Sequence, residues 1–187
     1  MKKIMFDDNY SLTEAVLEGR KTMTRRIVKH PEEVEINGHK YLQTEKLRYK
    51  VGEVVAVAQR YSELSWDKKF YAKLKGMCTG LPQKRLAGWD NKMFVKADLM
   101  PHRIRITNVR IERLQDISDE GCLREGIIER TNPDGFGGII KDYTFDNAFG
   151  FYYCPQEAFS ALINRVSGKG TWKSNPYVFV YEFKLIR

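Results

Sequence analysis

A change of phase in one strand pattern most constrains the fold of this chain. Residues 103–114 alternate between apolar and polar, with Ile104 and Ile106 in one phase and Val109 and Ile111 in the other. Strict alternation is typical of a half-buried β-strand. The switch between the two pairs predicts a β-bulge between Ile106 and Val109. Because a bulge bends its strand, the pattern favours a curved sheet of the kind that small barrels contain.

Three other strands and three short helices complete the expected architecture. Residues 22–28 are expected to be extended, because β-branched residues are interleaved with Arg25 and Arg26. Residues 53–58 are apolar on both faces, and residues 177–183 are bulky on both faces, which is typical of buried and central strands. Capping and stop residues place helices between Ser11 and Gly19, with a capping box of Ser11 and Glu14, between Ser118 and Gly126, and between Pro155 and Gly168. The regular βαβ alternation of a parallel sheet is missing. We therefore predict an α+β fold, a small mixed β-barrel with short flanking helices.

Three stretches interrupt this pattern. Residues 30–50 form a polar excursion with the hairpin-turn signal Asn37-Gly38. Within residues 62–100, short strands are expected at 70–74 and 93–95. Residues 131–153 are expected to form a long loop whose aromatic residues either stack bases or anchor the loop on the core: Phe136, Tyr143, Phe145, Phe149, Phe151, Tyr152 and Tyr153.

Composition narrows the classes of protein and partner. The 187 residues are 42% hydrophobic and suit one globular domain, and a net charge of +8 favours acidic partners, with nucleic acid first. Cys78, Cys122 and Cys154 lack the paired spacing of a secreted disulfide scaffold. No segment has the roughly 20 apolar residues of a membrane helix, and the N-terminus lacks the apolar run of a signal peptide. We expect a cytoplasmic protein without membrane contact.

Metal and cofactor sites are not expected. His30, His39 and His102 have no ligand-like spacing with the cysteines. The glycine spacing in residues 168–171 differs from that of a phosphate-binding loop. The sequence therefore predicts no metal and no cofactor.

The run Gly19-Arg20-Lys21-Thr22-Met23-Thr24-Arg25-Arg26 is the strongest functional signal. Cations this close repel one another, so they favour a nearby anion or carboxylate. The run also holds an amine, Lys21, and a hydroxyl, Thr24, and a lysine whose pKa is lowered by burial or nearby cations can activate a hydroxyl nucleophile. Because Thr22, Thr24 and Arg26 share one strand face, Lys21 must lie in the preceding turn to reach Thr24. Candidate ligand-binding residues are Arg20, Thr22, Arg25, Arg26 and, on the later strand, Arg103 and Arg105. The alternative for the last two is that they are solvated charges that protect a sheet edge.

Residues 19–26 resemble the signature of ASCH domains, members of the PUA-like superfamily. Three segments follow in the family order: 50–55 resembles the entry to the second strand, 109–118 the strand-to-helix junction, and 175–183 the closing strand. Together with residues 168–172, the chain resembles the longer ASCH proteins carried by bacteriophages and prophages. The resemblance implies a PUA-like pseudobarrel with a cleft between barrel and helices that binds RNA or nucleotides.

The resemblance also implies an activity for part of the family. Some short bacterial ASCH proteins are amidohydrolases that deacylate N4-acetylcytidine, and Lys21, Thr24 and Glu125 fall on their lysine, threonine and glutamate positions, with Arg26 on a further basic position. A related branch has been linked to RNA cleavage. Glu125 would either relay protons or pair with Lys21.

We therefore expect one ASCH/PUA-like domain over residues 1–187. This chain is longer than the short enzymes, and the extra material lies near residues 30–50, 62–100 and 131–153. We expect an RNA- or nucleotide-binding protein with a basic cleft. The alternatives are an N4-acylcytidine amidohydrolase and a non-catalytic interaction module.

Overall fold

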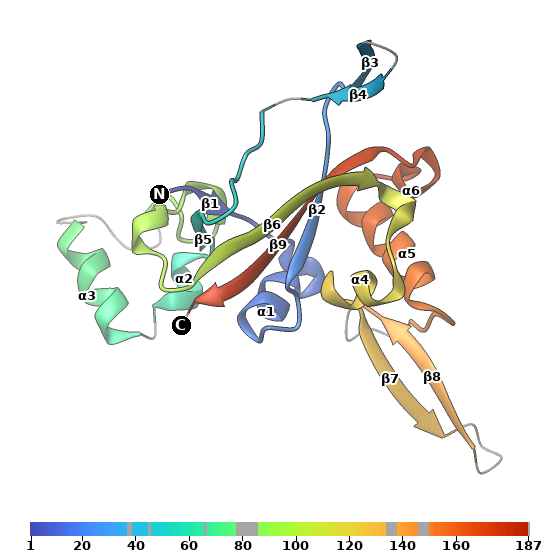
Figure 1. Cartoon of the computed structure of the whole chain (residues 1–187). Helices are drawn as coiled ribbons and strands as arrows, with labels where there is room; N and C mark the ends of the chain where they lie inside the picture. The colour runs from blue at the N-terminus through green and yellow to red at the C-terminus, as the bar shows by residue number, and fades with distance from the viewer. Residues whose placement is uncertain are drawn as a thin grey trace.

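The computed structural model describes residues 1–36, 39–44, 46–65, 67–77, 86–133, 138–145 and 150–186 (Figure 1). Its strands are β1 (Lys3–Ile4), β2 (Met23–Ile27), β3 (Glu32–Ile36), β4 (His39–Gln43), β5 (Val54–Val57), β6 (Arg103–Arg113), β7 (Ile128–Pro133), β8 (Ile139–Thr144) and β9 (Tyr177–Ile186). Its α-helices are α1 (Leu12–Leu17), α2 (Tyr61–Leu64), α3 (Lys68–Met77), α4 (Asp119–Arg124), α5 (Pro155–Ser167) and α6 (Thr171–Ser174). The predicted α+β class is confirmed.

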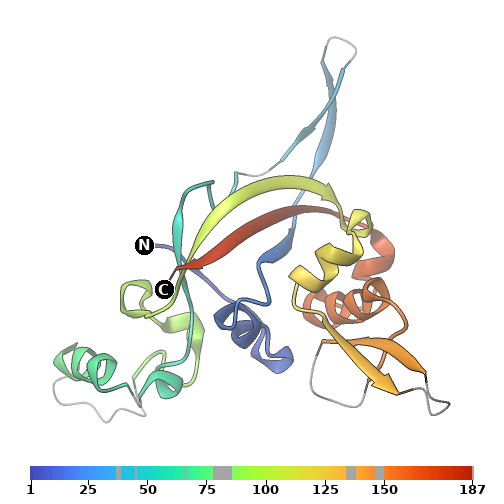
Figure 2. The same ribbon diagram turned by 60° about the horizontal axis from the view of Figure 1, so that its bottom comes forward.

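A five-stranded sheet in the order β1-β5-β6-β9-β2 forms the centre of the fold. The β1–β5 pair is parallel and the other pairs are antiparallel. Long β6 and β9 arch together, with α4 and α5 at one end and α2 and α3 at the other (Figure 2). Strands β1 and β2 remain the two edges, and within the described residues no strand pairing joins them. The sheet is thus strongly curved but not closed into the predicted barrel.

The curvature has the predicted local cause. The pairing register of β6 with β9 shifts between Ile106 and Asn108, which confirms the bulge. Before the bulge in sequence, Ile104 and Ile106 are completely buried. Strand β9 lies between β6 and β2, as its two-sided bulk predicted, and both Val180 and Tyr181 are buried.

The helix ends follow the sequence closely, with one exception. Gly19, Gly126 and Gly168 all have positive φ at or just after the helix ends, and the Ser118 hydroxyl accepts a hydrogen bond from the backbone N–H of Gly121. The predicted capping box of α1 is wrong. Ser11 is left-handed, with φ 51°, and its side chain makes no capping hydrogen bond; its own N–H closes the preceding 3-10 turn on the Asp8 carbonyl. That turn fixes the entry of the chain into α1.

The first interrupting stretch contains the predicted hairpin. Strands β3 and β4 pair with each other and project from the body of the molecule (Figure 1). The predicted turn residues 37–38 lie outside the described residues. The hairpin returns the chain, through residues 46–49, to the edge of the sheet.

The other two stretches differ from the predictions. Residues 70–74 lie in α3, because Phe70 and Leu74 are four residues apart and pack together into a second apolar cluster with Tyr61 and Leu64. Residues 92–94 form a 3-10 turn instead of a strand. Residues 131–153 contain most of the β7–β8 hairpin and are not one long loop. For residues 70–74, packing against the second apolar cluster decided between helix and strand.

The main core lies between the sheet, α1, α4 and α5. Leu12 and Val16 enter it from α1, Cys122 from α4, and Phe159 and Leu162 from α5. No helix among the described residues is long and apolar enough to cross a membrane. The helices of this core, α1, α4 and α5, leave an open edge of the sheet at β2, beside α5 and the segment that follows β1.

Candidate functional site

A cavity of about 440 Å³ lies at the open edge of the sheet. This volume is within the usual range of small-molecule sites, about 300–1,000 Å³. The cavity is lined by β2, β9 and α5, by residues 5–7 after β1, and by residues 46–49 after the hairpin. Five aromatic side chains are among its lining residues, and each is at most 4% exposed: Phe6, Tyr49, Phe159, Phe179 and Tyr181. Its ionisable side chains include six cations, Lys21, Arg25, Arg26, Lys29, Lys46 and Arg48, and two acids, Asp7 and Glu125.

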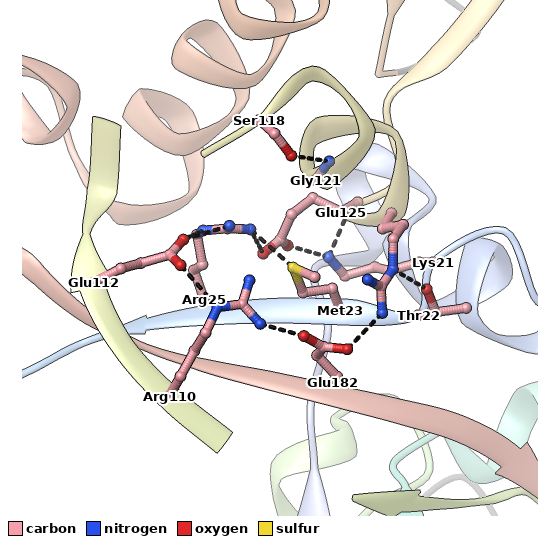
Figure 3. Close-up of polar contacts among 11 residues, drawn as sticks. Lys21, Thr22, Met23, Arg25, Arg110, Glu112, Ser118, Gly121, Glu125 and Glu182 are labelled. Carbon is pink, nitrogen blue, oxygen red and sulfur yellow. Dashed lines mark hydrogen bonds and ion pairs between the residues drawn. The ribbon is translucent and has the colours of Figure 1, made fainter. Parts of the chain in front are cut away.

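The three predicted catalytic residues, Lys21, Thr24 and Glu125, all line this cavity and are almost completely buried. Lys21 Nζ donates hydrogen bonds to Glu125 Oε2 at 2.5 Å and to the Glu125 carbonyl at 2.6 Å (Figure 3). Lys21 precedes the start of β2, as the alternation argument required. The structure thus brings together an amine and a carboxylate that are 104 residues apart in the chain.

Close packing fixes the position of Lys21. Its backbone N–H donates to the carbonyl of Ala15, at the end of α1. Gly126, with φ +106°, lies so close that a Cβ at this position would be 3.7 Å from Lys21 Cδ and 3.3 Å from Leu12 Cδ2. A residue without a side chain is therefore needed where the end of α4 meets α1.

Burial changes the proton affinity of Lys21. Desolvation lowers the pKa of the ammonium, and the charge and hydrogen bond of Glu125 oppose this effect. The charges of Arg26 and Arg25 lower the pKa further. The net direction is downward, so the neutral amine is more accessible than for an exposed lysine.

Thr24 lies in β2 opposite Tyr181 of β9. It lines the same cavity as Lys21, and no side chain or carbonyl in the described ranges hydrogen-bonds its hydroxyl. The hydroxyl is therefore available to a ligand. The site combines an amine of lowered pKa, an acid and an uncommitted alcohol.

Arg25 lines the cavity, but its guanidinium is held by two carboxylates of the protein. Its side chain is 1% exposed. Nη1 donates to Glu125 Oε1 at 3.0 Å, whereas Nη2 and Nε donate to Glu112 Oε1 at 2.6 and 3.1 Å (Figure 3). Arg25 was predicted as a ligand-binding residue, but the structure gives its guanidinium two carboxylate partners. Both oxygens of Glu125 are in turn occupied, one by Lys21 and one by Arg25.

The remaining predicted ligand-binding residues are divided between the cavity and other surfaces. Arg26 lines the cavity and donates from Nη2 to the Met5 carbonyl at 2.6 Å. Arg20 pairs with Glu18 and lines a smaller hollow of about 260 Å³ instead. Thr22 accepts a hydrogen bond from Arg124 Nε at 3.1 Å and does not line the main cavity.

Arg103 and Arg105 also lie away from the cavity. They are exposed on β6 and alternate with the buried Ile104 and Ile106. Because successive strand residues point to opposite faces, burying the isoleucines directs both arginines outward. Arg103 and Arg105 are therefore not part of the cavity.

Sequence reasoning missed the part of the cavity that comes from the first interrupting stretch. Lys29 precedes the β3–β4 hairpin, and Lys46, Arg48 and Tyr49 follow it. A signal was present, since a hairpin brings its two ends together and cations flank both ends. The two limbs of the hairpin thus deliver three cations and an aromatic ring to the cavity.

The aromatic residues of 131–153 mostly anchor this segment. Phe145 is buried and stacks on Tyr152, with ring centroids 5.8 Å apart. Phe151 and Tyr153 are 63% and 81% exposed and contact each other edge to face. Phe136 and Phe149 lie outside the described residues. None of the described aromatic residues of this segment lines the cavity.

Neither a metal-binding cluster in the described part of the chain nor a similar protein indicates a function for the cavity. Within the described ranges, no group of three or more His, Cys, Asp or Glu side chains is arranged to hold a metal ion. Comparisons with models of known protein families, with curated proteins and with solved structures found no match to this chain. The chemistry of the cavity is therefore what supports a function.

Proposed function

We propose that this chain binds RNA or a nucleotide in the cavity at the open edge of its sheet. The observation that carries the proposal is the combination of aromatic walls and cationic side chains in one cavity of about 440 Å³. Aromatic faces stack nucleobases of any sequence. Lysine and arginine side chains bind phosphates. A nucleotide offers a partner to both kinds of side chain.

The charge balance of the cavity supports an anionic ligand. Six cations and two carboxylates line it, so the lining has an excess of four positive charges (6 − 2) when Lys21 is protonated. Glu125 already has two cationic partners, Lys21 and Arg25. Asp7 accepts a hydrogen bond from the backbone N–H of Asn9. The cations nearer the surface, such as Arg26 and Arg48, thus remain available to balance phosphate charge.

The resemblance of residues 19–26 to ASCH domains agrees with this proposal. We infer that the chain is a member of that family, and that its arched sheet corresponds to a PUA-like barrel with a gap between β1 and β2. The bulge in β6 and the contact from Arg26 to Met5 across the gap support this inference. The ligand would occupy the gap.

The binding proposal is tested with a labelled single-stranded RNA and fluorescence anisotropy. Affinity should fall steeply as salt rises from about 50 to about 200 mM. Arg48→Gln should weaken binding and reduce the salt slope by about 0.7, the contribution of one phosphate contact to a single strand. The matched control is Arg105→Gln, which removes the same charge from an exposed position away from the cavity. Binding without salt dependence, or an equal loss in both variants, would contradict the proposal.

A second candidate is hydrolysis of an N4-acylated cytidine. The observation that favours it is a buried amine of lowered pKa, Lys21, in the same cavity as the uncommitted Thr24 hydroxyl. The neutral Lys21 amine would take the hydroxyl proton while Thr24 Oγ1 attacks the acyl carbon. The C–N bond would then break, and the cytosine amine would leave with the proton from Lys21. Water would hydrolyse the acyl-threonine, which releases a carboxylate and restores the enzyme.

Thr24→Val separates the two candidates, because valine keeps the shape of threonine and lacks the hydroxyl. If Thr24 is a nucleophile, release of cytidine from N4-acetylcytidine should fall on the order of 10³-fold or more. RNA affinity should stay unchanged, since no phosphate contact is lost. Turnover that persists in Thr24→Val would rule out this mechanism. A wild-type protein that neither hydrolyses nor binds would leave an interaction module as the remaining interpretation.

A further inference from the structure

The Lys21–Glu125 pair is one end of a longer chain of ion pairs (Figure 3). Arg25 joins Glu125 to Glu112, whose other oxygen accepts from Arg110 Nε at 2.9 Å. Arg110 also contacts Glu182, and Glu182 Oε2 accepts from Arg124 Nη2 at 2.9 Å. Charges of opposite sign therefore alternate in the order Lys21, Glu125, Arg25, Glu112, Arg110, Glu182, Arg124.

This alternating chain has one positive charge too many. It contains four cations and three carboxylates, so when all are ionised the sum is +1 (4 − 3). Arginine side chains remain protonated in proteins. Among the four cations, Lys21 alone can lose its proton. Its ammonium is also at the buried end, whereas the Arg124 side chain at the other end is 34% exposed to water.

We propose that Arg25 is a positioning residue that shares Glu125 with Lys21 and thereby makes the Lys21 amine the group that exchanges a proton with the cavity. The proposal rests on the proposed function, because it concerns the site at which the ligand would bind. Arg25 itself touches no ligand in this scheme. It acts on Lys21 through the carboxylate between them.

The contacts of Arg25 suit it to this role. Nε and Nη2 both donate to one oxygen of Glu112. Nη1 donates to Glu125 and contacts Met23 Sδ at 3.2 Å. The guanidinium lies 5.9 Å from the ring centroid of Phe159 on α5. From the other side, a Cβ built on Gly121 of α4 would be 3.5 Å from Nη2. The guanidinium is thus confined by β2, β6, α4 and α5, and it holds Glu125 in one orientation.

Arg25 has two effects on Lys21 with the same sign. It draws hydrogen-bonding capacity and negative charge of Glu125 away from the ammonium, and its own positive charge repels that ammonium. Glu112 works in the opposite direction, because it partly neutralises Arg25. The charged groups that face Lys21 are Glu125 from the end of α4 and Arg25 and Arg26 from β2. Phe6, which follows β1, places an uncharged ring 5.9 Å from the Lys21 nitrogen.

Opposite predictions for two variants test this role. In protein with isotopically labelled lysine side chains, the Lys21 signal is identified by its absence from Lys21→Met and then followed by NMR from neutral to alkaline pH. Arg25→Gln should move the Lys21 titration to higher pH, because Glu125 then serves Lys21 alone. Glu112→Gln should move it to lower pH, because the charge of Arg25 is then uncompensated on that side. Arg105→Gln, an exposed charge of the same type, should leave it in place.

The signs separate positioning from general support of the fold. If both variants merely loosen the site, water enters and Lys21 moves to higher pH in both, which would overturn the proposal. A titration that is unchanged in both variants would also overturn it. Should Arg25→Gln fail to fold, the downward shift in Glu112→Gln still decides the question. The titration needs no ligand, so loss of the binding proposal in the RNA experiment would be seen separately.

Discussion

Replacing Glu125 by alanine is expected to destabilise the protein by about 3–5 kcal/mol at neutral pH. The carboxylate is buried, and each of its oxygens pairs with a buried cation, Lys21 or Arg25. Removing it leaves two positive charges together in the interior with one fewer partner. Urea unfolding followed by circular dichroism, with the free energy extrapolated to water, measures the loss.

The matched control is Glu33→Ala. Glu33 is exposed and pairs with Arg113 at 3.4 Å, at the base of the β3–β4 hairpin. Exposed pairs of this kind contribute about 0–1 kcal/mol. A similar cost for the two variants would mean that water screens Glu125 as well as it screens Glu33. The buried network would then be without energetic importance.

Lys21→Met should cost less than Glu125→Ala, because Glu125 keeps its Arg25 partner. The remaining difference should depend on pH. The pKa of Lys21 is lower in the folded protein than in the unfolded chain, so between these two values the unfolded chain binds more protons. The contribution of Lys21 to stability therefore rises as pH increases through that window, and it is least favourable below the folded-state pKa. Wild type should gain stability relative to Lys21→Met on the alkaline side, and a loss there would contradict this sign.

The local sequence pattern predicted those elements in which one face is buried. The alternation of Ile104 and Ile106 and its switch at Val109 located the bulge, because burial of one strand face imposes the phase. The same logic failed for Phe70 and Leu74. Their spacing of four fits a helix, but the aromatic and aliphatic character of the segment also fits a strand. The contacts of Phe70 and Leu74 with the apolar cluster around Tyr61 decide between helix and strand, and the sequence of the segment itself does not reveal these contacts.

The site was predictable to the extent that it depends on motif and spacing. Lys21, Thr24 and Glu125 were assigned together from a resemblance, and all three line the cavity. The burial of Arg25 could not be predicted in this way. Arg25 and its neighbour in sequence, Arg26, both line the cavity, but Arg26 is exposed, whereas Arg25 is buried against Glu112, 87 residues away. Alternation separates the two side chains, but only the packed helices α4 and α5 determine what each one meets.

Phe159→Ala is the second large effect that we expect, a loss of about 3–5 kcal/mol in unfolding free energy. Phe159 is buried on α5, where it contacts Trp172 edge to face at 6.1 Å between centroids and approaches the Arg25 guanidinium. Truncation leaves a void between the helices and the cavity that the surrounding sheet cannot fill. Phe151→Ala removes the same atoms from an exposed position and should stay within about 0.5 kcal/mol of wild type. Equal costs in urea unfolding would show that α5 does not hold the site together.

Phe159 also connects stability to the proposed binding. It forms part of the cavity wall and part of the contact that confines Arg25. Phe159→Ala should therefore lower RNA affinity and stability together, whereas Arg48→Gln should lower affinity alone, because Arg48 is an exposed cation at the cavity and not a core residue. If Phe159→Ala loses stability but retains full RNA affinity at a temperature where it is folded, the ligand does not occupy this cavity. Measured side by side, the two variants thus distinguish RNA binding in this cavity from RNA binding to a basic surface elsewhere on the protein.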